Sequence, residues 1–311
     1  VNIRKKRSKP GLRHQHVACV NAAAEICGAR CTGNVLGSET VEFFPTAPRA
    51  GNYFFNIPTA GSAMQVVQTV LPILSFAAEP STVTVRGGTH NPAAPPYDFF
   101  HASFLPLLRR VGITAEIELR RYGFFPIGGG EIAVKIFPSS QPPHAFAFHH
   151  RGELISVHSE ILISRLPQSI AQRESKILQQ HLQWPAAKIK ITEISDSPGP
   201  GNVILIHARY GETTYLFTAF GQRGKPAEKV ALEACETYLD FHRSNTALDE
   251  HLTNQIILYL ALKNGGAFTS HSLSRHTETN IEVLKRFLEA TITVEKKDDR
   301  CFEIHVERFT R

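Results

Sequence analysis

The hydrophobic pattern of the chain contains an order of elements that occurs more than once. Between Gly51 and Pro138, alternating segments predict strands and segments with helical spacing predict helices, in the order β-α-β-α-β-β. Ser62 is a suitable N-cap for the first helix, and Gly112 is a suitable residue to end the second. The predicted strands are residues 51–57, 81–86, 113–120 and 131–137, and the predicted helices are residues 61–76 and 97–111.

The same order recurs in the C-terminal segment, where a long insertion interrupts it. A leading strand at residues 144–149 is separated from its helix by residues 151–245. After the insertion the pattern predicts helices at 250–262 and from near Asn280, and strands at 267–270, 291–295 and 301–306. Within the insertion it predicts strands at 154–163, 188–194, 202–208 and 213–219, and helices at 169–182 and 227–241. These are enough for a small α/β domain.

The N-terminal segment shows only the second half of this order. It predicts a short strand ending near Arg4, a helix at residues 15–27, and strands at 30–36 and 41–44. The first strand and first helix of the unit have no counterpart, so we expect about 30 residues to precede Val1. A permuted or degenerate first unit is the alternative.

These patterns together predict an α/β (α+β) fold of three repeated βαβαββ units, the first incomplete, plus an inserted small α/β domain. We expect residues 1–149 and 246–311 to form one domain and residues 150–245 to form the other. A length of 311 residues is sufficient for two hydrophobic cores.

Composition and cysteine usage are those of a globular cytoplasmic protein. Hydrophobic residues make up 42% of the chain and charged residues 20%. The longest apolar stretch, residues 66–78, contains Gln68 and Pro72 and falls short of the roughly 20 residues that span a bilayer. The five cysteines form no CxxC pair, and although Cys27 and Cys31 have loose metal-ligand spacing, we expect buried thiols. We therefore expect a cytoplasmic protein with no membrane partner.

Basic residues concentrate near the N-terminus. The formal net charge is +6 and the pI is near 9.1, which favours an anionic partner such as a nucleotide or a nucleic acid. The basic cluster is either a solvated tail or a phosphate-binding loop, because guanidinium groups match phosphate oxygens and the helix that follows adds backbone donors. It consists of Arg4, Lys5, Lys6, Arg7, Lys9 and Arg13.

Three further loops carry residues suited to chemistry, although the chain has no P-loop, GxSxG or HExxH motif. Residues 59–62 enter the helix in which Gln68 is either a hydrogen-bonded core amide or a ligand contact. Residues 86–100 include Pro95 and Phe99, which could wall a slot for a planar base. Packing of a helix opened by proline explains these two residues equally well.

The last of these loops leads to His276, just before the helix predicted near Asn280. A neutral imidazole is an available nucleophile near neutral pH, and a helix N-terminus disfavours its protonation and stabilises an attached phosphate. The chain has 15 histidines, however, and the hydrophobic pattern does not distinguish His276 from the others. A capping or surface role is the alternative for any one of them.

Several short motifs are weak alone but specific in their combined order and spacing. They are Lys9-Pro10-Gly11-Leu12 with Gln15-His16, Ala60-Gly61-Ser62 with Gln68-Thr69-Val70-Leu71-Pro72, Gly87-Gly88-Thr89 with Asn91-Pro92 and Ala94-Pro95-Pro96, Gly123-Phe124-Phe125-Pro126, and His276 with Thr279-Asn280-Ile281. With these motifs the whole chain resembles the RNA 3′-terminal phosphate cyclase family. The resemblance implies the fold shared with the enolpyruvyl transferases, with an inserted domain.

The resemblance also implies a nucleotide-binding ligase of RNA processing that converts an RNA 3′-phosphate to a 2′,3′-cyclic phosphate. In this family a histidine takes AMP from ATP (adenylylation), AMP passes to the RNA 3′-phosphate, and the vicinal 2′-hydroxyl then expels it. By motif match the nucleophile is His276, with ATP, a divalent cation (Mg²⁺ or Mn²⁺) and RNA with a 3′-phosphate end as cofactors and partner. The nucleotide- and phosphate-binding residues so implied are Arg4, Arg7, Gln15, Gln68, Pro95, Phe99, His251 and Asn254. No residue is assigned as a metal ligand, and we allow for a homo-oligomer.

Three positions depart from the family pattern. Asn254 lies where the family usually has Asp, His251 lies where Tyr is frequent, and His90 replaces an Asp. The family's glycine-rich segment, with a Glu and an Arg of its site, would belong to the residues expected before Val1. These departures favour, as the alternative function, a catalytically weakened or inactive member that binds RNA or acts in ribosome biogenesis.

Overall fold

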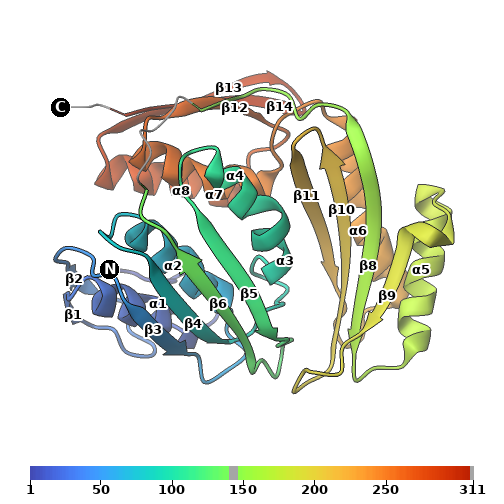
Figure 1. Cartoon of the computed structure of the whole chain (residues 1–311), viewed down its shortest axis with the longest axis horizontal. Coiled ribbons are helices and arrows are strands. Elements are labelled where there is room, and N and C mark those ends of the chain that lie inside the picture. The colour runs from blue at the N-terminus through green and yellow to red at the C-terminus, as the bar shows by residue number, and fades with distance from the viewer. Residues whose placement is uncertain (140–145, 309–311) are drawn as a thin grey trace.

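The computed structural model of the chain describes residues 1–139 and 146–308. Three four-stranded sheets and a two-stranded hairpin form its framework. We call residues 51–138 the second unit, and the C-terminal segment that the insertion interrupts the third unit. Figure 1 shows the sheet of the second unit on the left, the sheet of the third unit across the top and the sheet of the insertion on the right. The α/β fold expected from the sequence is confirmed.

The second unit has the order of elements that the sequence predicts. Its helical segment from Tyr97 to Arg109 is not uniform, because Phe100–Phe104 form a π-helical turn (η1) between two short α-helices. Such turns are rare and frequently occur at functional sites. The elements are β3 (Asn52–Asn56), α2 (Ala63–Leu74), β4 (Ser81–Gly87), α3 (Tyr97–Phe99), α4 (Leu105–Arg109), β5 (Ala115–Arg121) and β6 (Gly130–Ile136).

The third unit follows the same order around the insertion. Its elements are β7 (Phe146–Phe148), α7 (Glu250–Leu262), β12 (Gly266–Ser270), α8 (Arg275–Phe287), β13 (Ala290–Asp298) and β14 (Cys301–Arg308). The start of the predicted leading strand, at residues 144 and 145, lies outside the described residues. One prediction was wrong: α8 begins at Arg275 and not near Asn280, because the Ser274 hydroxyl caps it by accepting the Thr277 amide.

The second and third units have the same sheet topology. The strand order is β3-β4-β6-β5 in the second unit and β7-β12-β14-β13 in the third. In both, the first pair of strands is parallel and the other two pairs are antiparallel. A helix, α2 or α7, lies in the connection of each parallel pair, as such pairs require a crossover. The hydrophobic pattern and the observed strand order therefore agree for these two units.

The N-terminal segment contains the last three elements of a unit. They are α1 (His14–Ile26), which packs against α2, and the antiparallel pair β1 (Arg30–Thr32) and β2 (Glu42–Phe44). The strand expected near Arg4 is not formed in the described chain. The backbone turns there instead, with the Arg7 amide bonded to the Arg4 carbonyl, and Arg4 has a φ of 54°. A strand requires negative φ, so residue 4 cannot continue one.

The insertion folds as a sheet with two helices packed on it. The strand order is β11-β10-β8-β9, with β8 and β9 parallel and the other pairs antiparallel. Its elements are β8 (Leu154–Ser164), α5 (Gln168–Leu182), η2 (Ala186–Lys188), β9 (Ile189–Glu193), β10 (Gly201–Tyr210), β11 (Thr213–Phe220) and α6 (Ala227–Arg243). The helices α5 and α6 contact each other and the sheet. The domain boundaries at residues 150 and 245 stay a prediction.

The insertion meets the second unit through a turn of small residues. At Gly201, the first residue of β10, an added Cβ would lie 2.0 Å from the Phe124 ring. At Gly199 an added Cβ would lie 2.6 Å from the Ile127 Cβ. Only glycine permits this approach, since a Cβ at such distances would require the neighbours to move. The turn at residues 197–201 thus holds the insertion against the segment between β5 and β6.

The apolar stretch at residues 66–78 is the centre of the second unit's core. Its fully buried side chains are Val66, Val67, Val70, Leu71 and Leu74. They lie on α2, which packs against its own sheet and against α1, so both sides of the helix are covered. Full burial of such a side chain contributes about 1.5–3 kcal/mol. Gln68 is only half-buried and lies at the edge of this core.

Two expectations from the sequence concern the whole chain: its apolar stretches are too short to span a bilayer, and its cysteines are buried thiols. Across the described ranges, no helix combines the length and the apolar character needed to cross a bilayer. All five cysteines are free. Burial raises the pKa of the Cys235 thiol to about 12 and also raises that of Cys27, so both are protonated and poorly reactive at neutral pH.

Candidate functional site

The basic loop at the N-terminus is closed by one of its own arginines. The Arg4 guanidinium donates hydrogen bonds to the carbonyls of Lys9 (2.7 Å) and Gly11 (3.1 Å). Gly11 has a φ of 74°, and an added Cβ would lie 2.1 Å from the Gly37 carbonyl oxygen. The loop is therefore folded against the N-terminal hairpin, which excludes the solvated tail that charge alone left open.

The loop leads into the start of α1, at the edge of a cleft of about 1520 Å³. Arg4, Arg7 and Gln15 all line this cleft, as does Arg13, the N-cap residue of α1. The first turn of α1 contains no acidic residue. Three arginines and the free amides of a helix start all favour a bound anion.

Gln15 connects α1 to the start of α2. Its Oε1 accepts the Ser62 backbone amide (3.3 Å), and its Nε2 donates to the Gln65 Oε1 (2.7 Å). The partner of Gln15 on α2 is thus Gln65, and Gln68, which the resemblance implies as a nucleotide-binding residue, is not part of this contact. The two glutamines are three residues apart, and this spacing places both on one side of the helix. That spacing was the signal by which Gln65 could have been found.

The loop between β4 and α3 is fixed by a buried histidine. The His90 Nε2 lies 2.7 Å from the Asp98 Oδ2, and its Nδ1 lies 2.8 Å from the Thr89 Oγ1. The ring stacks against Tyr122 and lies tilted against Phe124, with centroids 5.2 and 5.3 Å away. Burial raises the pKa of Asp98, but the hydrogen bond and charge of His90 outweigh this and hold it below its usual value. The histidine that departs from the family pattern is therefore a structural partner of Asp98.

Phe99 and His251 meet edge to face at the end of this loop. Their ring centroids are 6.5 Å apart with an interplanar angle of 88°. Phe99 is 3% exposed and packs on Phe104, so packing explains it, while the His251 side chain is 63% exposed. Pro95, half-buried, precedes α3 in the same loop. An open imidazole over a buried aromatic ring can receive a planar base by stacking.

His276 is the second residue of α8, and its side chain is exposed. The next residue, Thr277, is fully buried and bonded to the cap residue Ser274 through both its amide and its hydroxyl. The backbone at His276 is therefore held in place while its ring faces solvent. The free amides of this first helical turn favour a negatively charged group beside the ring.

The Asn280 side chain on α8 forms a hydrogen bond to Asn254 on α7. Its Nδ2 donates to the Asn254 carbonyl (3.0 Å) and lies 3.4 Å from the Asn254 Oδ1. His276 is one turn before Asn280, and His251 is one turn before Asn254, so each pair lies on one side of its helix. The Phe99–His251 contact extends this surface to α3. Four residues implied by the resemblance thus lie along one strip, which we call the α3–α7–α8 strip (Phe99, His251, Asn254 and His276).

The predicted residues therefore fall into two groups. Arg4, Arg7 and Gln15 line the large cleft, and the described residues that line it do not include the four of the α3–α7–α8 strip. One segment joins the groups, because residues 91–94 line the cleft and Pro95 and Phe99 follow directly. Gln68 belongs to neither the strip nor the described lining of the cleft.

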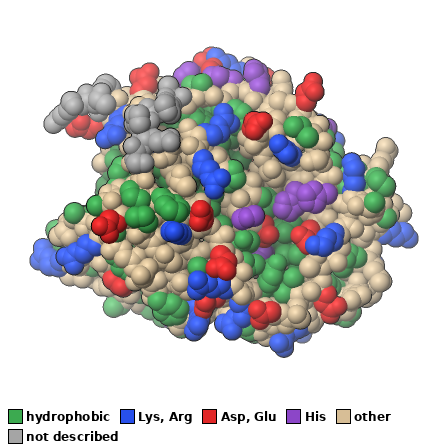
Figure 2. Space-filling view, in the orientation of Figure 1, with side chains coloured by type: hydrophobic (Ala, Val, Ile, Leu, Met, Phe, Trp, Pro, Cys, Tyr) green, Lys and Arg blue, Asp and Glu red, His purple; other side chains and the backbone are tan. Residues whose placement is uncertain are grey.

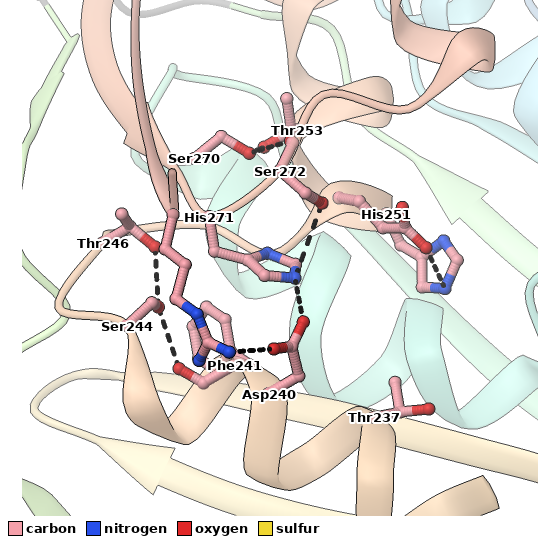
Figure 3. A network of polar contacts seen from close by, with 12 residues as sticks. Thr237, Asp240, Phe241, Ser244, Thr246, His251, Thr253, Ser270, His271 and Ser272 are labelled. Carbon is pink, nitrogen blue, oxygen red and sulfur yellow. Dashed lines mark hydrogen bonds and ion pairs between the residues drawn. The ribbon is translucent and has the colours of Figure 1, made fainter. Parts of the chain in front are cut away.

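A smaller cavity of about 620 Å³ adjoins His251. Figure 3 shows His271 beside Asp240 and Ser272, with His251 across from them at the start of α7. The His271 Nε2 lies 3.7 Å from the Asp240 Oδ2. Burial lowers the pKa of His271 and raises that of Asp249, the buried N-cap of α7, so both groups are shifted toward their neutral forms.

Comparison with known proteins decides the family. A sequence model described as RNA 3′-terminal phosphate cyclase matches residues 1–294. The protein of that name from Ectopseudomonas mendocina is 41% identical over 307 residues, which cover 99% of this chain and 89% of the relative. That from Pseudomonas fluorescens is 42% identical over 304 residues, or 97% of this chain and 88% of the relative. The chain belongs to the RNA 3′-terminal phosphate cyclase family.

Family membership and the enzyme class expected from the sequence are thus confirmed. The roles of individual residues in this cyclase-family chain stay predictions. The structure adds Gln65 to the candidates and gives contacts to Arg13, already named in the basic cluster, and to Asn280, already named in the motif around His276. The contact of Asn280 with Asn254 was not predicted, because hydrophobic spacing on α8 identifies the buried side and gives no partner for a polar residue. In the part of the chain that the structure describes, no three His, Cys, Asp or Glu side chains are grouped to hold a metal ion.

Proposed function

We propose that this chain converts the 3′-terminal phosphate of RNA to a 2′,3′-cyclic phosphate with ATP, using His276 as the nucleophile. The α3–α7–α8 strip supports this proposal, because it combines an exposed histidine at a helix N-terminus with an open imidazole over a buried aromatic ring. The match to the RNA 3′-terminal phosphate cyclase family indicates which reaction such a strip would catalyse.

The reaction proceeds in three steps. A ring nitrogen of neutral His276 forms a bond to the α-phosphorus of ATP, and pyrophosphate leaves. An oxygen of the RNA 3′-phosphate then takes the AMP group and releases His276. The adjacent 2′-hydroxyl attacks the 3′-phosphorus, AMP leaves, and the hydroxyl proton passes to solvent. Each activated intermediate splits one difficult step into easier ones.

The surrounding residues bind and orient ATP and the RNA phosphate. The exposed His251, which lies against the buried Phe99, receives the adenine ring, and the Asn254–Asn280 contact fixes the spacing of α7 and α8. Arg4, Arg7 and Gln15 bind phosphate oxygens, where negative charge develops during transfer. Mg²⁺ or Mn²⁺ would neutralise further phosphate charge, bound through substrate oxygens with few protein ligands.

The test is covalent labelling of the chain with ATP radiolabelled at the α-phosphate, in the presence of Mg²⁺ or Mn²⁺. We expect acid-labile label on the wild type, none on His276→Ala, and full label on His305→Ala, a half-exposed histidine on β14. Labelling that survives His276→Ala would refute the mechanism. Binding of 3′-phosphorylated RNA without any AMP transfer would instead support the RNA-binding alternative.

A further inference from the structure

We infer that the cleft between the second unit and the insertion holds the single-stranded RNA segment that precedes the 3′-terminal phosphate. This inference rests on the proposed function and gives the inserted domain a role in it. The cleft is lined on one side by the start of α1 and the loops of the second unit, and on the other by α5, the start of β10 and the loop between β11 and α6.

The size and position of the cleft fit a strand better than one small ligand. Its volume of about 1520 Å³ exceeds the roughly 300–1,000 Å³ of sites for single small molecules. It begins at Arg4, Arg7 and Gln15, where the proposed function places phosphate, and continues to the insertion. A strand whose 3′ end lies at the arginines therefore has room for preceding nucleotides in the same cleft.

The charge of the lining is almost entirely positive. The cationic side chains are Arg4, Arg7, Arg13, Arg223 and Lys225, and the one acidic side chain among the described lining residues is Glu174. Arg223 is exposed, and no hydrogen bond or ion pair ties its side chain to another residue of the described ranges. Lys225 is paired with Glu233 of α6. Such a groove attracts a phosphate backbone.

Aromatic side chains lie among these cations. Phe124, Phe125 and Phe220 all line the cleft, and Phe125 is 60% exposed although it is large and apolar. An exposed ring in the same cleft as arginines is the combination that binds unpaired bases in proteins that bind single strands. Figure 2 shows one face of the molecule, on which basic, acidic and hydrophobic side chains are mixed along the lower part.

A buried polar group gives an independent sign of a ligand. Glu174 on α5 is fully buried, its Oε2 accepts the Asn202 amide (2.9 Å), and its Oε1 has no hydrogen-bond partner among the described residues. Burial of an unpaired polar atom costs about 1–3 kcal/mol, so a bound group that supplies a partner is favoured. Burial also raises the pKa of Glu174 to about 7, which weakens its repulsion of phosphate at neutral pH.

The experiment compares RNA lengths and matched variants by fluorescence anisotropy, a readout that needs no catalysis. The probes are 3′-phosphorylated single strands, one a dinucleotide and one of about ten nucleotides, within the usual site sizes of single-strand binding proteins. The variants are Arg223→Glu with the exposed control Lys229→Glu, and Phe125→Ala with the control Phe54→Ala, which is 54% exposed on β3. Neither control residue lines the cleft.

We expect Phe125→Ala to weaken binding of the longer RNA about fivefold or more, as loss of one stacked base does. Arg223→Glu should weaken it as well and reduce its salt dependence by about one phosphate contact. Binding of the dinucleotide should be unchanged, and both controls should match the wild type.

Equal effects of Arg223→Glu and Lys229→Glu would overturn the inference, as would equal loss for both RNA lengths. Displacement of the RNA by polyglutamate with the same dependence on Phe125 and Arg223 would overturn it in favour of an acidic polypeptide. If the length-dependent losses appear but His276 is never labelled, the proposed function fails and this inference survives. Labelled His276 without length-dependent losses gives the opposite result.

Discussion

The second and third units have the same sheet but use the loop after their second strand differently. In the second unit, the loop after β4 contains His90, which is 1% exposed and has both ring nitrogens in polar contacts. In the third unit, the loop after β12 leads to His276, which is exposed and whose ring has no hydrogen bond to a described residue. The segments that follow the second strand of the two units therefore carry one histidine whose ring nitrogens are both engaged and one whose ring is exposed.

The two histidines differ in their backbone, since His90 lies in a loop and His276 in the first turn of α8, and they differ in the neighbours of each ring. Asp98, Thr89 and two aromatic rings enclose His90. At His276 the enclosed residue is the next one, Thr277, so the backbone is fixed while the ring is left open. A nucleophile needs a ring nitrogen that no protein group occupies, and of these two histidines His276 is the one that provides it.

The largest effect on stability is expected where the histidine is enclosed. His90→Ala leaves the Asp98 carboxylate without its partner, and removing one partner of a buried pair costs about 3–5 kcal/mol. His276→Ala should change the free energy of unfolding by less than about 0.5 kcal/mol, as exposed substitutions do. Urea denaturation of both variants measures this. Equal losses of stability would contradict the prediction that the His90 side chain stabilises the fold and the His276 side chain does not.

The next effect concerns the insertion, which only the third unit contains. The folded pKa of Glu174 is about 7, above its ordinary value of 4.5, so the folded state binds the extra proton between these values. Stability should therefore fall by roughly 3 kcal/mol as the pH rises from 4.5 through 7. Glu174→Gln removes this loss. The difference in unfolding free energy between variant and wild type should grow from pH 5 to pH 8, and a constant difference would contradict the prediction.

A smaller effect is expected where the insertion meets the second unit. Gly201→Ala places a Cβ against the Phe124 ring, and such overpacking costs about 1–3 kcal/mol. Gly51 is the control, because it has no positive φ and an added Cβ there would lie 3.6 Å from the nearest atom, an ordinary van der Waals contact. Thermal unfolding should show a lower midpoint for Gly201→Ala than for Gly51→Ala. The reverse order would mean that the two regions are not held together at this turn.

The smallest effect is expected at Asn254, one of the two departures from the family pattern on the α3–α7–α8 strip. Asn254→Asp keeps an acceptor for Asn280 and adds a charge, and a charged hydrogen bond exceeds a neutral one by about 1 kcal/mol. We expect a modest increase in the rate of His276 labelling at neutral pH. Rapid-quench measurement of label on both proteins tests this. A strong decrease would show that the amide donor of Asn254 is needed.

Local patterns predicted most elements well, with particular failures. Residues 250–262 were predicted as a helix and are α7, whereas α8 begins five residues before the predicted Asn280 because its first turn carries polar residues and a serine cap. The π-turn at Phe100–Phe104 was also missed, since five consecutive residues there fit a helix of ordinary pitch. Arg4 failed as a strand residue because its conformation depends on bonds to Lys9 and Gly11.

The sequence by itself determined the order of strands and helices, the repeat, the insertion and the family, because alternation, helical spacing and motif order are properties of neighbouring residues. Tertiary structure alone decided which side chains meet. The contacts Gln15–Gln65 and Asn254–Asn280, and the cleft between the second unit and the insertion, each join segments distant along the chain. Such contacts depend on how whole elements pack, which no local pattern encodes.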